Sequence, residues 1–216
     1  MIGEIFLGDI KTWNDPKIAA LNEGVELPAT AISVFFRSDE SGTTDNFQKY
    51  LAGSAPDVWK SEPPRCGRAR SAAASPSPTV WRRASRHRGW HHLRRVELRH
   101  LEQPGCRQID NGGGAVELTG ESAGKALTAA EVAGEGNDLK LKLDYATKEA
   151  GVYPAVLVTY EIVCSKGLDA DKTTLVKAFL KHFSSTETQT SLQAAGYAPL
   201  PAEIQTKVQA AVEAIS

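Results

Sequence analysis

The arginine residues of this 216-residue chain are confined almost entirely to one stretch. Eleven of the twelve lie between Arg65 and Arg107, and positions 63–108 contain no lysine, although thirteen lysines occur elsewhere. Because only two acidic residues oppose these arginines, positions 63–108 carry a net charge of +9 and the rest of the chain −10. The stretch has no clean apolar face and includes the low-complexity run SAAASPSPT, so we do not expect it to pack into a core.

The sequence before this stretch alternates between helix and strand signals. Asp15 and Pro16 supply an N-cap and a first-turn proline, which predict a short helix. An apolar run at 32–36 predicts a buried strand. Ser41 and Thr43 are then expected to cap a helix that carries Phe47 and Leu51 on one face.

The sequence after the stretch shows the same alternation. We expect a helix near 121–134, a strand at 153–164, and a final helix at 202–215. The run at 171–185 predicts an amphipathic helix whose apolar residues are four apart, namely Leu175, Phe179 and Phe183. Strands that alternate with helices indicate α/β layers.

Composition restricts the class of protein. A chain of this length with 41% apolar residues can form one large domain or two modest lobes. No stretch is long and apolar enough to span a membrane, and Met1 is not followed by a signal peptide. Two of the three cysteines, Cys66 and Cys106, lie within the arginine-rich stretch and Cys164 lies outside it, so the sequence predicts no disulfide framework.

The motif FFRSDESGTTDNF combines residues suited to binding an oxyanion. Free N–H groups at a helix start attract anions; Ser41 and Thr43 add hydroxyl donors and Gly42 lets an ion approach the backbone. Arg37 offers a planar bidentate donor, which Asp39 can orient. The alternative is an ordinary capped helix beside a surface Arg–Asp pair, and spacing alone favours that alternative.

The stretch IFLGDIKTWNDPKIAALNEGVELPATAISVFFRSDESGTTDNFQKYLAG resembles the periplasmic phosphate-binding proteins of the phosphate-specific ABC importer. In that family a G.I..W.D..I..LN.G..LP stretch precedes an R.D.SGT anion site. The similarity covers positions 2–53, and YPAVLVTYEIV and AGYAPLP with IQTKV resemble the family's returning strand and final helices. The resemblance implies that Arg37, Ser41, Gly42 and Thr43 are phosphate ligands and that Asp39 braces Arg37.

The resemblance also implies an architecture and a biological role. The fold is expected to be α/β, of periplasmic-binding-protein type II, with two lobes joined by hinge strands and incomplete here. Positions 1–34 would be a remnant of lobe 1, 35–152 lobe 2, and 153–216 the return to lobe 1. The expected protein is a monomeric, non-catalytic receptor without cofactor or metal. It binds a phosphate ion, delivers it to the importer's membrane permease, and does not bind nucleic acid.

This chain departs from the family pattern at its start. The family's first lobe begins before Met1, with a second Ser/Thr-bearing loop and an aspartate that accepts the phosphate proton. We therefore expect this chain to bind anions weakly, with little selectivity over sulfate, and to fold only in part. The intact protein is expected in the periplasm or at the cell surface as a lipoprotein. A phosphatase-like enzyme acting on phosphate esters is the alternative function.

The arginine-rich stretch has three competing explanations. Restoring three single bases, with GC-rich codons assumed, converts 64–107 into a turn-rich loop followed by ITYVEWSFA, an apolar strand that resembles the family's GITYVEW. We therefore interpret 64–107 as a frameshift translation without ordered structure. The alternatives are a basic nucleic-acid-binding arm with Trp81 and Trp90, and a metal site. The metal site would use His87, His91, His92, His100 and Cys106, whose spacings match no standard zinc module. The remaining histidine, His182, is expected to be a surface or packing residue.

Overall fold

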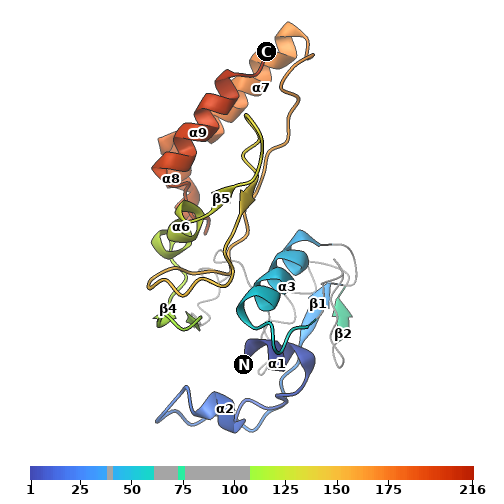
Figure 1. Ribbon diagram of the computed structural model, residues 1–216, viewed down its shortest axis with the longest axis vertical. Helices are drawn as coiled ribbons and strands as arrows, with labels where there is room; N and C mark the ends of the chain where they lie inside the picture. The colour runs from blue at the N-terminus through green and yellow to red at the C-terminus, as the bar shows by residue number, and fades with distance from the viewer. Residues whose placement is uncertain (38–40, 61–72, 76–107) are drawn as a thin grey trace. The chain divides into compact units, whose positions relative to one another are not determined.

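The computed structural model describes residues 1–37, 41–60, 73–75 and 108–216. The chain divides into two compact units, Met1–Leu93 and Arg94–Ser216 (Figure 1). The three-part division expected from the sequence stays a prediction. No helix among the described residues has both the length and the apolar composition needed to cross a bilayer.

The first unit begins with two short helices, α1 (Ile2–Leu7) and α2 (Pro16–Ala19). The Asp15 side chain accepts a hydrogen bond from the Lys17 N–H at 2.9 Å, and Pro16 is the first helical residue, so the predicted helix start is confirmed. Lys17 also donates a hydrogen bond to Glu4, and this bond lowers the pKa of Glu4. One charged contact thus ties α2 to α1.

Strand β1 (Phe35–Arg37) pairs in parallel with β2 (Ala73–Ser75). The strand predicted at 32–36 is confirmed only at its C-terminal end. Ile32 instead donates its N–H to the carbonyl of Lys11 at 2.8 Å, next to an isolated bridge between Thr12 and Ala31. Within the range interpreted as frameshifted, 64–107, β2 is ordered as a strand, and the rest lies outside the described residues.

Helix α3 (Gly42–Ser54) contributes three of the seven buried apolar side chains among the described residues of this unit. Phe47 and Leu51 are 9% and 1% exposed, as predicted from their spacing. The Phe6 ring of α1 contacts the Phe47 ring edge to face, with centroids 4.8 Å apart. Burial raises the pKa of Tyr50, so its phenol stays neutral. This packing fixes the helix that begins at the predicted anion motif.

The second unit starts with two small antiparallel pairs on either side of helix α6 (Gly120–Thr128). Strand β3 (Ile109–Asp110) pairs with β4 (Ala115–Val116), and β5 (Glu131–Val132) pairs with β6 (Leu141–Lys142). Helix α6 confirms the first half of the helix predicted near 121–134. A small core joins this helix to the chain that follows β6, through Ala123, Ala126, Val152 and Val156.

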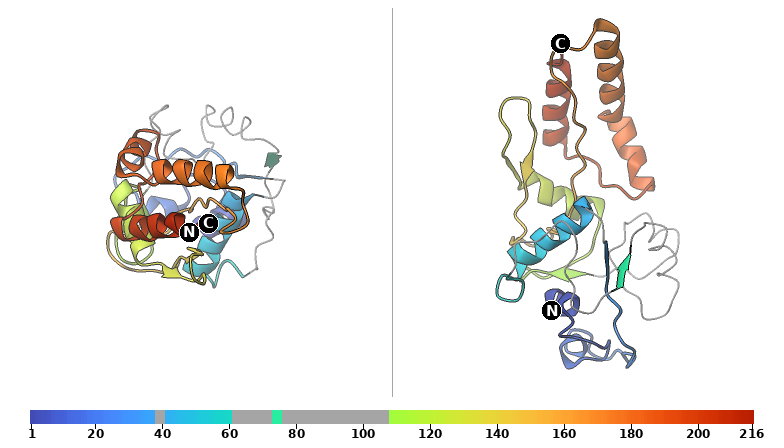
Figure 2. Two further views of the ribbon diagram at one scale, coloured as in Figure 1. Left: turned by 90° about the horizontal axis from the view of Figure 1, so that it is seen from above. Right: turned by 90° about the vertical axis from the view of Figure 1, so that its right-hand side faces the viewer.

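Three helices complete the second unit: α7 (Ala170–Phe183), α8 (Thr186–Ala194) and α9 (Ala202–Glu213). Both views in Figure 2 show α7 beside α9. Their shared core consists of Leu180, Val212 and Ile215, flanked by Val176 and Val208. The helices predicted at 171–185 and 202–215 are confirmed, whereas α8, which Ser185 caps, was not predicted.

The apolar stripe predicted for α7 is not its buried face. Leu175 and Phe179 are 70% and 56% exposed, because α9 packs against the neighbouring Val176 and Leu180 instead. The Phe179 and Phe183 rings stack on each other at 5.9 Å. The amphipathic spacing therefore identified the helix but not the side that α9 covers.

The α7–α9 pair is also tied by polar contacts. Lys177 Nζ donates to the carbonyl oxygens of Glu213 and Ile215 at 2.8 and 3.0 Å, at the end of α9. Lys181 forms an ion pair with Glu213 at 2.7 Å, which lowers the pKa of Glu213. Gln205 Nε2 donates to the carbonyl of Ser184 at 2.7 Å. The two helices are therefore connected at both ends of their contact.

The strand predicted at 153–164 is wrong. These residues form neither strand nor helix, and Ile162 is 94% exposed. A strand is defined by backbone hydrogen bonds to a neighbouring strand, and no described strand pairs with this segment. The β-branched and aromatic residues of 153–164 favour an extended strand, but a strand also needs a neighbouring strand to pair with.

Candidate anion-binding site

The backbone of the first unit brings a strand end close to a helix start. Arg37 is the last residue of β1, and α3 begins at Gly42. Asp39 and the Arg37 side chain lie outside the described residues. Of the five predicted site residues, the structure therefore describes three in full: Ser41, Gly42 and Thr43.

Ser41 is the N-cap of α3. Its backbone is extended, with φ −146° and ψ 120°, and its Oγ accepts a hydrogen bond from the Thr44 N–H at 3.4 Å. The residue is 7% exposed. The hydroxyl acts as the acceptor in this bond, and its proton has no acceptor among the described residues. Ser41 is thus confirmed as a cap, whereas Thr43, also expected to cap, is the second residue of the helix.

The first turn of α3 presents backbone donors at an open surface. Among the described residues, the N–H groups of Gly42 and Thr43 have no acceptor, as expected for the first positions of a helix. Both residues are exposed, and a Cβ atom built on Gly42 would meet nothing within 4 Å in the described structure. An ion could therefore approach these two donors directly.

The electrostatics of this helix start favour an anion. The helix dipole places partial positive charge at Gly42 and Thr43. Asp45, in the first turn, would oppose an anion, but Lys49 forms an ion pair with it at 2.8 Å. This pairing was not predicted, although the i, i+4 spacing of Asp45 and Lys49 was visible in the sequence. The net charge of the turn is therefore close to zero, and its dipole is not cancelled.

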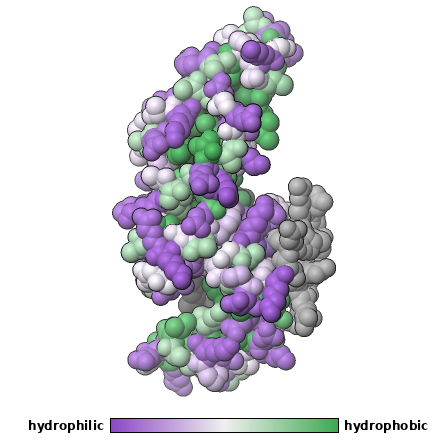
Figure 3. Space-filling model, in the orientation of Figure 1, coloured by the Kyte–Doolittle hydropathy of each residue, from purple (hydrophilic) through white to green (hydrophobic). Residues whose placement is uncertain are grey.

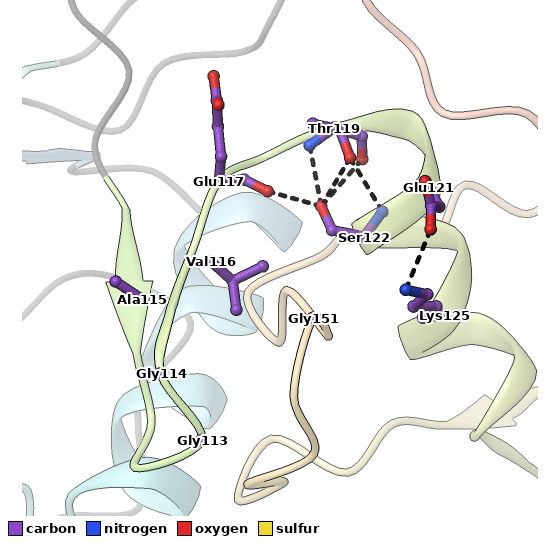
Figure 4. A pocket seen from close by; sticks show the side chains of 10 residues that line it. All are labelled: Gly113, Gly114, Ala115, Val116, Glu117, Thr119, Glu121, Ser122, Lys125 and Gly151. Atoms are coloured by element: carbon purple, nitrogen blue, oxygen red, sulfur yellow. Dashed lines mark hydrogen bonds and ion pairs between the residues drawn. The ribbon is translucent and has the colours of Figure 1, made fainter.

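A separate pocket of about 340 Å³ lies in the second unit (Figure 4). Its charged side chains are Glu117, Glu121 and Lys125, and Lys125 forms an ion pair with Glu121 at 3.0 Å. The charges of these three described side chains therefore sum to −1. None of the predicted site residues lines it; the lining consists of Gly113, Gly114, Ala115, Val116, Glu117, Thr119, Glu121, Ser122, Lys125 and Gly151.

The hydroxyls beside this pocket are already bonded to one another. Ser122 N–H donates to Thr119 Oγ1 at 3.0 Å, and Thr119 N–H donates to Ser122 Oγ at 2.9 Å, which makes a complete capping box. Ser122 Oγ also donates to the carbonyl of Glu117 at 2.7 Å. These groups stabilise α6 and are not available to a ligand.

The described residues contain no group of His, Cys, Asp and Glu side chains that could hold a metal ion. The histidines of the metal-site alternative, and Cys106, lie outside the described residues. His182 is exposed in the last turn of α7, which confirms it as a surface residue. Cys164 is also exposed.

Comparisons with known proteins identify the relatives of the chain. It is 40% identical to phosphate-binding protein PstS 2 of Mycobacterium tuberculosis, over 99% of this chain and 59% of that protein. It is 40% identical to PstS 3 of the same organism, over 100% of this chain and 59% of that protein. The phosphate-binding protein PstS of Pasteurella multocida is 52% identical over 60 residues, 28% of this chain and 17% of that protein.

A solved structure confirms the fold class. A high-affinity periplasmic phosphate-binding protein, PfluDING, bound with phosphate, matches with a TM-score of 0.64 at 19% identity. The match covers 97% of this chain and 63% of that one. The chain thus has the two-lobe α/β periplasmic-binding fold expected from the sequence, and it spans about 59% of the length of its mycobacterial relatives. The model of the PBP superfamily domain matches residues 1–187, and the chain therefore belongs to the PBP superfamily.

Proposed function

We propose that this protein binds inorganic phosphate and delivers it to the membrane permease of an ABC importer without catalysing a reaction. The observation that carries the proposal is the open N-terminus of α3, which follows a strand ending in Arg37. The similarity to mycobacterial proteins named for phosphate binding supports it. The intact protein is proposed to act in the periplasm or at the cell surface as a lipoprotein.

The phosphate ion would be held by donors of three kinds. The N–H groups of Gly42 and Thr43 point from the helix start and cost no reorganisation. The hydroxyls of Ser41 and Thr43 donate to further oxygens. Arg37 would bind two oxygens with its planar guanidinium, and Asp39 would hold that guanidinium in orientation. Together these groups replace part of the hydration shell that the ion loses.

This arrangement suits binding rather than hydrolysis. A serine nucleophile needs an adjacent base to take its proton. The Ser41 oxygen instead accepts from the Thr44 N–H, which cannot act as a base. Among the described residues, the helix start therefore offers donors to an oxyanion, and no carboxylate or imidazole hydrogen-bonds to the Ser41 hydroxyl.

We expect weak binding by this chain. A charge-assisted bond contributes about 1.5–3 kcal/mol and a helix terminus about 0.3–1 kcal/mol. Their sum, about 1.8–4 kcal/mol, corresponds to a dissociation constant on the order of 1–50 mM. The proton-accepting aspartate of the family is not among the proposed ligands, so sulfate should compete with phosphate.

The test is a ³¹P NMR titration of inorganic phosphate with the full chain. Arg37→Met should remove most of the binding. Ser41→Ala should weaken it several-fold, whereas the control Thr119→Ala, which removes the cap of α6 instead, should leave it unchanged.

Four other outcomes of the titration and its companion assays would contradict parts of the proposal. Equal loss in Ser41→Ala and Thr119→Ala would remove the site from α3. Tight binding that excludes sulfate would overturn the weak, unselective binding expected here. Hydrolysis of p-nitrophenyl phosphate would favour the phosphatase alternative. Salt-sensitive DNA binding without phosphate binding would favour the basic-arm alternative.

A further inference from the structure

The turn between β3 and β4 contains Asn111–Gly112, and no other asparagine of the chain is followed by glycine. An asparagine in this position is chemically labile, because glycine has no Cβ to hinder attack of its backbone nitrogen on the asparagine side chain. Gly113 and Gly114 continue the turn, as Figure 4 shows. Whether the pair reacts therefore depends on how the turn holds it.

The Asp110 carboxylate holds the backbone of this turn. Its Oδ1 accepts hydrogen bonds from the N–H groups of Gly112 and Gly114, at 2.6 and 3.2 Å. The Gly112 nitrogen must lose its proton before it can attack. A proton that is bonded to a carboxylate is harder to remove, because the resulting anion would lie beside a negative charge. Asp110 therefore opposes the first step of the reaction.

The Asn111 side chain is held by a distant part of the same unit. Its Nδ2 donates a hydrogen bond to the carbonyl oxygen of Tyr145 at 3.2 Å. The turn also lies close against the backbone at Lys148, since a Cβ atom built on Gly113 would clash with the Lys148 carbonyl. Movement of the Asn111 side chain toward the Gly112 nitrogen would break the bond to Tyr145. These contacts join described residues of one unit, so they do not depend on what covers its outer surface.

We propose that Asn111 is a deamidation site that the folded turn protects and that reacts once the second unit opens. In the reaction the Gly112 nitrogen, after losing its proton, forms a bond to Asn111 Cγ. The bond from Cγ to Nδ2 breaks, and ammonia leaves with a proton taken from water. Water then opens the resulting succinimide ring at either carbonyl, which yields aspartate or isoaspartate.

The product cannot restore the original contacts. An aspartate at 111 places a carboxylate against the Tyr145 carbonyl oxygen and beside Asp110, and isoaspartate also lengthens the backbone by a methylene group. Asp110 and Gly112 are exposed, and hydrophilic residues lie over the face of the second unit drawn in Figure 3, so water for the second step is at hand. Deamidation is thus a one-way record of opening, and its chemistry is independent of the phosphate site in the first unit.

The test is mass spectrometry of the full chain after incubation at mildly alkaline pH. Trypsin cuts after Arg107 and Lys125 and releases 108–125, in which Asn111 is the only asparagine. The wild-type chain should deamidate in concentrated urea and should react roughly tenfold more slowly in buffer, the factor that a charge-assisted hydrogen bond is typically worth. Asp110→Ala should raise the rate in buffer roughly tenfold for the same reason and leave the rate in urea nearly unchanged.

The matched control is Asp138→Ala. It removes a bond of the same kind from the same unit, in which the Lys140 N–H donates to Asp138 Oδ1 at 3.1 Å, and should leave the rate at Asn111 unchanged. Equal wild-type rates in buffer and in urea would overturn the protection, and this comparison decides the proposal even where Asp110→Ala fails to fold. Equal rates for Asp110→Ala and either the wild-type chain or the control would overturn the role of Asp110. An unmodified 108–125 in urea would show that Asn111 is not the site.

Discussion

Helices α3 and α6 begin with similar sequences, Ser41-Gly42-Thr43 and Thr119-Gly120-Glu121, but their N-termini differ as places to bind an anion. At α6 the two capping hydroxyls bond to each other, and Glu121 carries negative charge in the first turn. At α3 a single hydroxyl caps the helix through a long bond of 3.4 Å. Its first turn also contains an acidic residue, Asp45, which Lys49 pairs with as Lys125 pairs with Glu121. A helix dipole is common to both, so the proposal that α3 rather than α6 binds an anion rests on the hydrogen bonds of the capping side chains.

Removing one capping hydroxyl from each helix should affect the two helices differently. Ser122→Ala should lower the free energy of unfolding by about 1–3 kcal/mol, because it leaves the Thr119 N–H and the Glu117 carbonyl without their partner. Ser41→Ala should cost only about 0.5–1 kcal/mol, since its bond is long. Urea denaturation followed by circular dichroism measures both. A loss that is equal in the two variants would show that the caps are equivalent.

A second comparison replaces the glycine at each start. Gly42→Ala should raise the free energy of unfolding by up to about 1 kcal/mol, because no atom lies near the new Cβ and its φ is not positive. The same methyl group should weaken phosphate binding by blocking approach to the backbone. Gly120→Ala places its Cβ 3.4 Å from Gln193 Nε2 and should be tolerated. Calorimetric melting and the ³¹P titration test this pair; unchanged phosphate binding in Gly42→Ala would count against the site.

The smallest effect is expected from the lysines that follow each start. Lys49 pairs with Asp45, and Lys125 pairs with Glu121, both at i, i+4. Lys49→Met and Lys125→Met should each lower the free energy of unfolding by only about 0.2–0.5 kcal/mol. Lys49→Met should also weaken phosphate binding severalfold at low salt, because Asp45 would then repel the ion. Identical phosphate titrations for the two variants would rule out this role for Lys49.

Local sequence signals predicted local structure well. Asp15 and Ser41 cap the helices they were expected to cap, because a cap bonds to the backbone only two or three residues away. Features that depend on a distant partner were predicted less well. The strand at 153–164 lacks a described neighbour, and α9 covers Val176 and Leu180 of α7 rather than Leu175 and Phe179. Hydrophobic spacing specifies a face but not what will pack on it.

Only part of the candidate site could be predicted from the sequence. The structure places Ser41, Gly42 and Thr43 at an exposed helix start, and the ligand roles of these residues stay a prediction. The roles of Arg37 and Asp39 also remain predictions, because neither side chain is described. The sequence analysis considered only Asp39, which precedes the helix, and overlooked Asp45 in the first turn of α3, whose charge Lys49 offsets.

The origin of 64–107 is a question about the gene rather than the fold. Our hypothesis is that three missing bases produce its arginine-rich sequence, because restoring them yields a strand like that of the family. Resequencing the DNA that encodes positions 60–112 tests this directly. Recovery of the three bases would support the frameshift, and an unchanged sequence would make a real basic segment or a decayed gene the better explanation.

Lys177 caps the C-terminal end of α9, and this contact should hold the two helices together even when the chain between them is cut. Lys177 of α7 holds the carbonyls of Glu213 and Ile215, and an apolar core and Gln205 join the same two helices. The connection between α8 and α9 is therefore not the principal link between these segments. A protease that cuts within 195–201 should yield a nicked species whose two pieces co-migrate under native conditions and separate only in denaturant. The contacts between α7 and α9 should thus keep the fold of this part of the chain together without an intact backbone between α8 and α9.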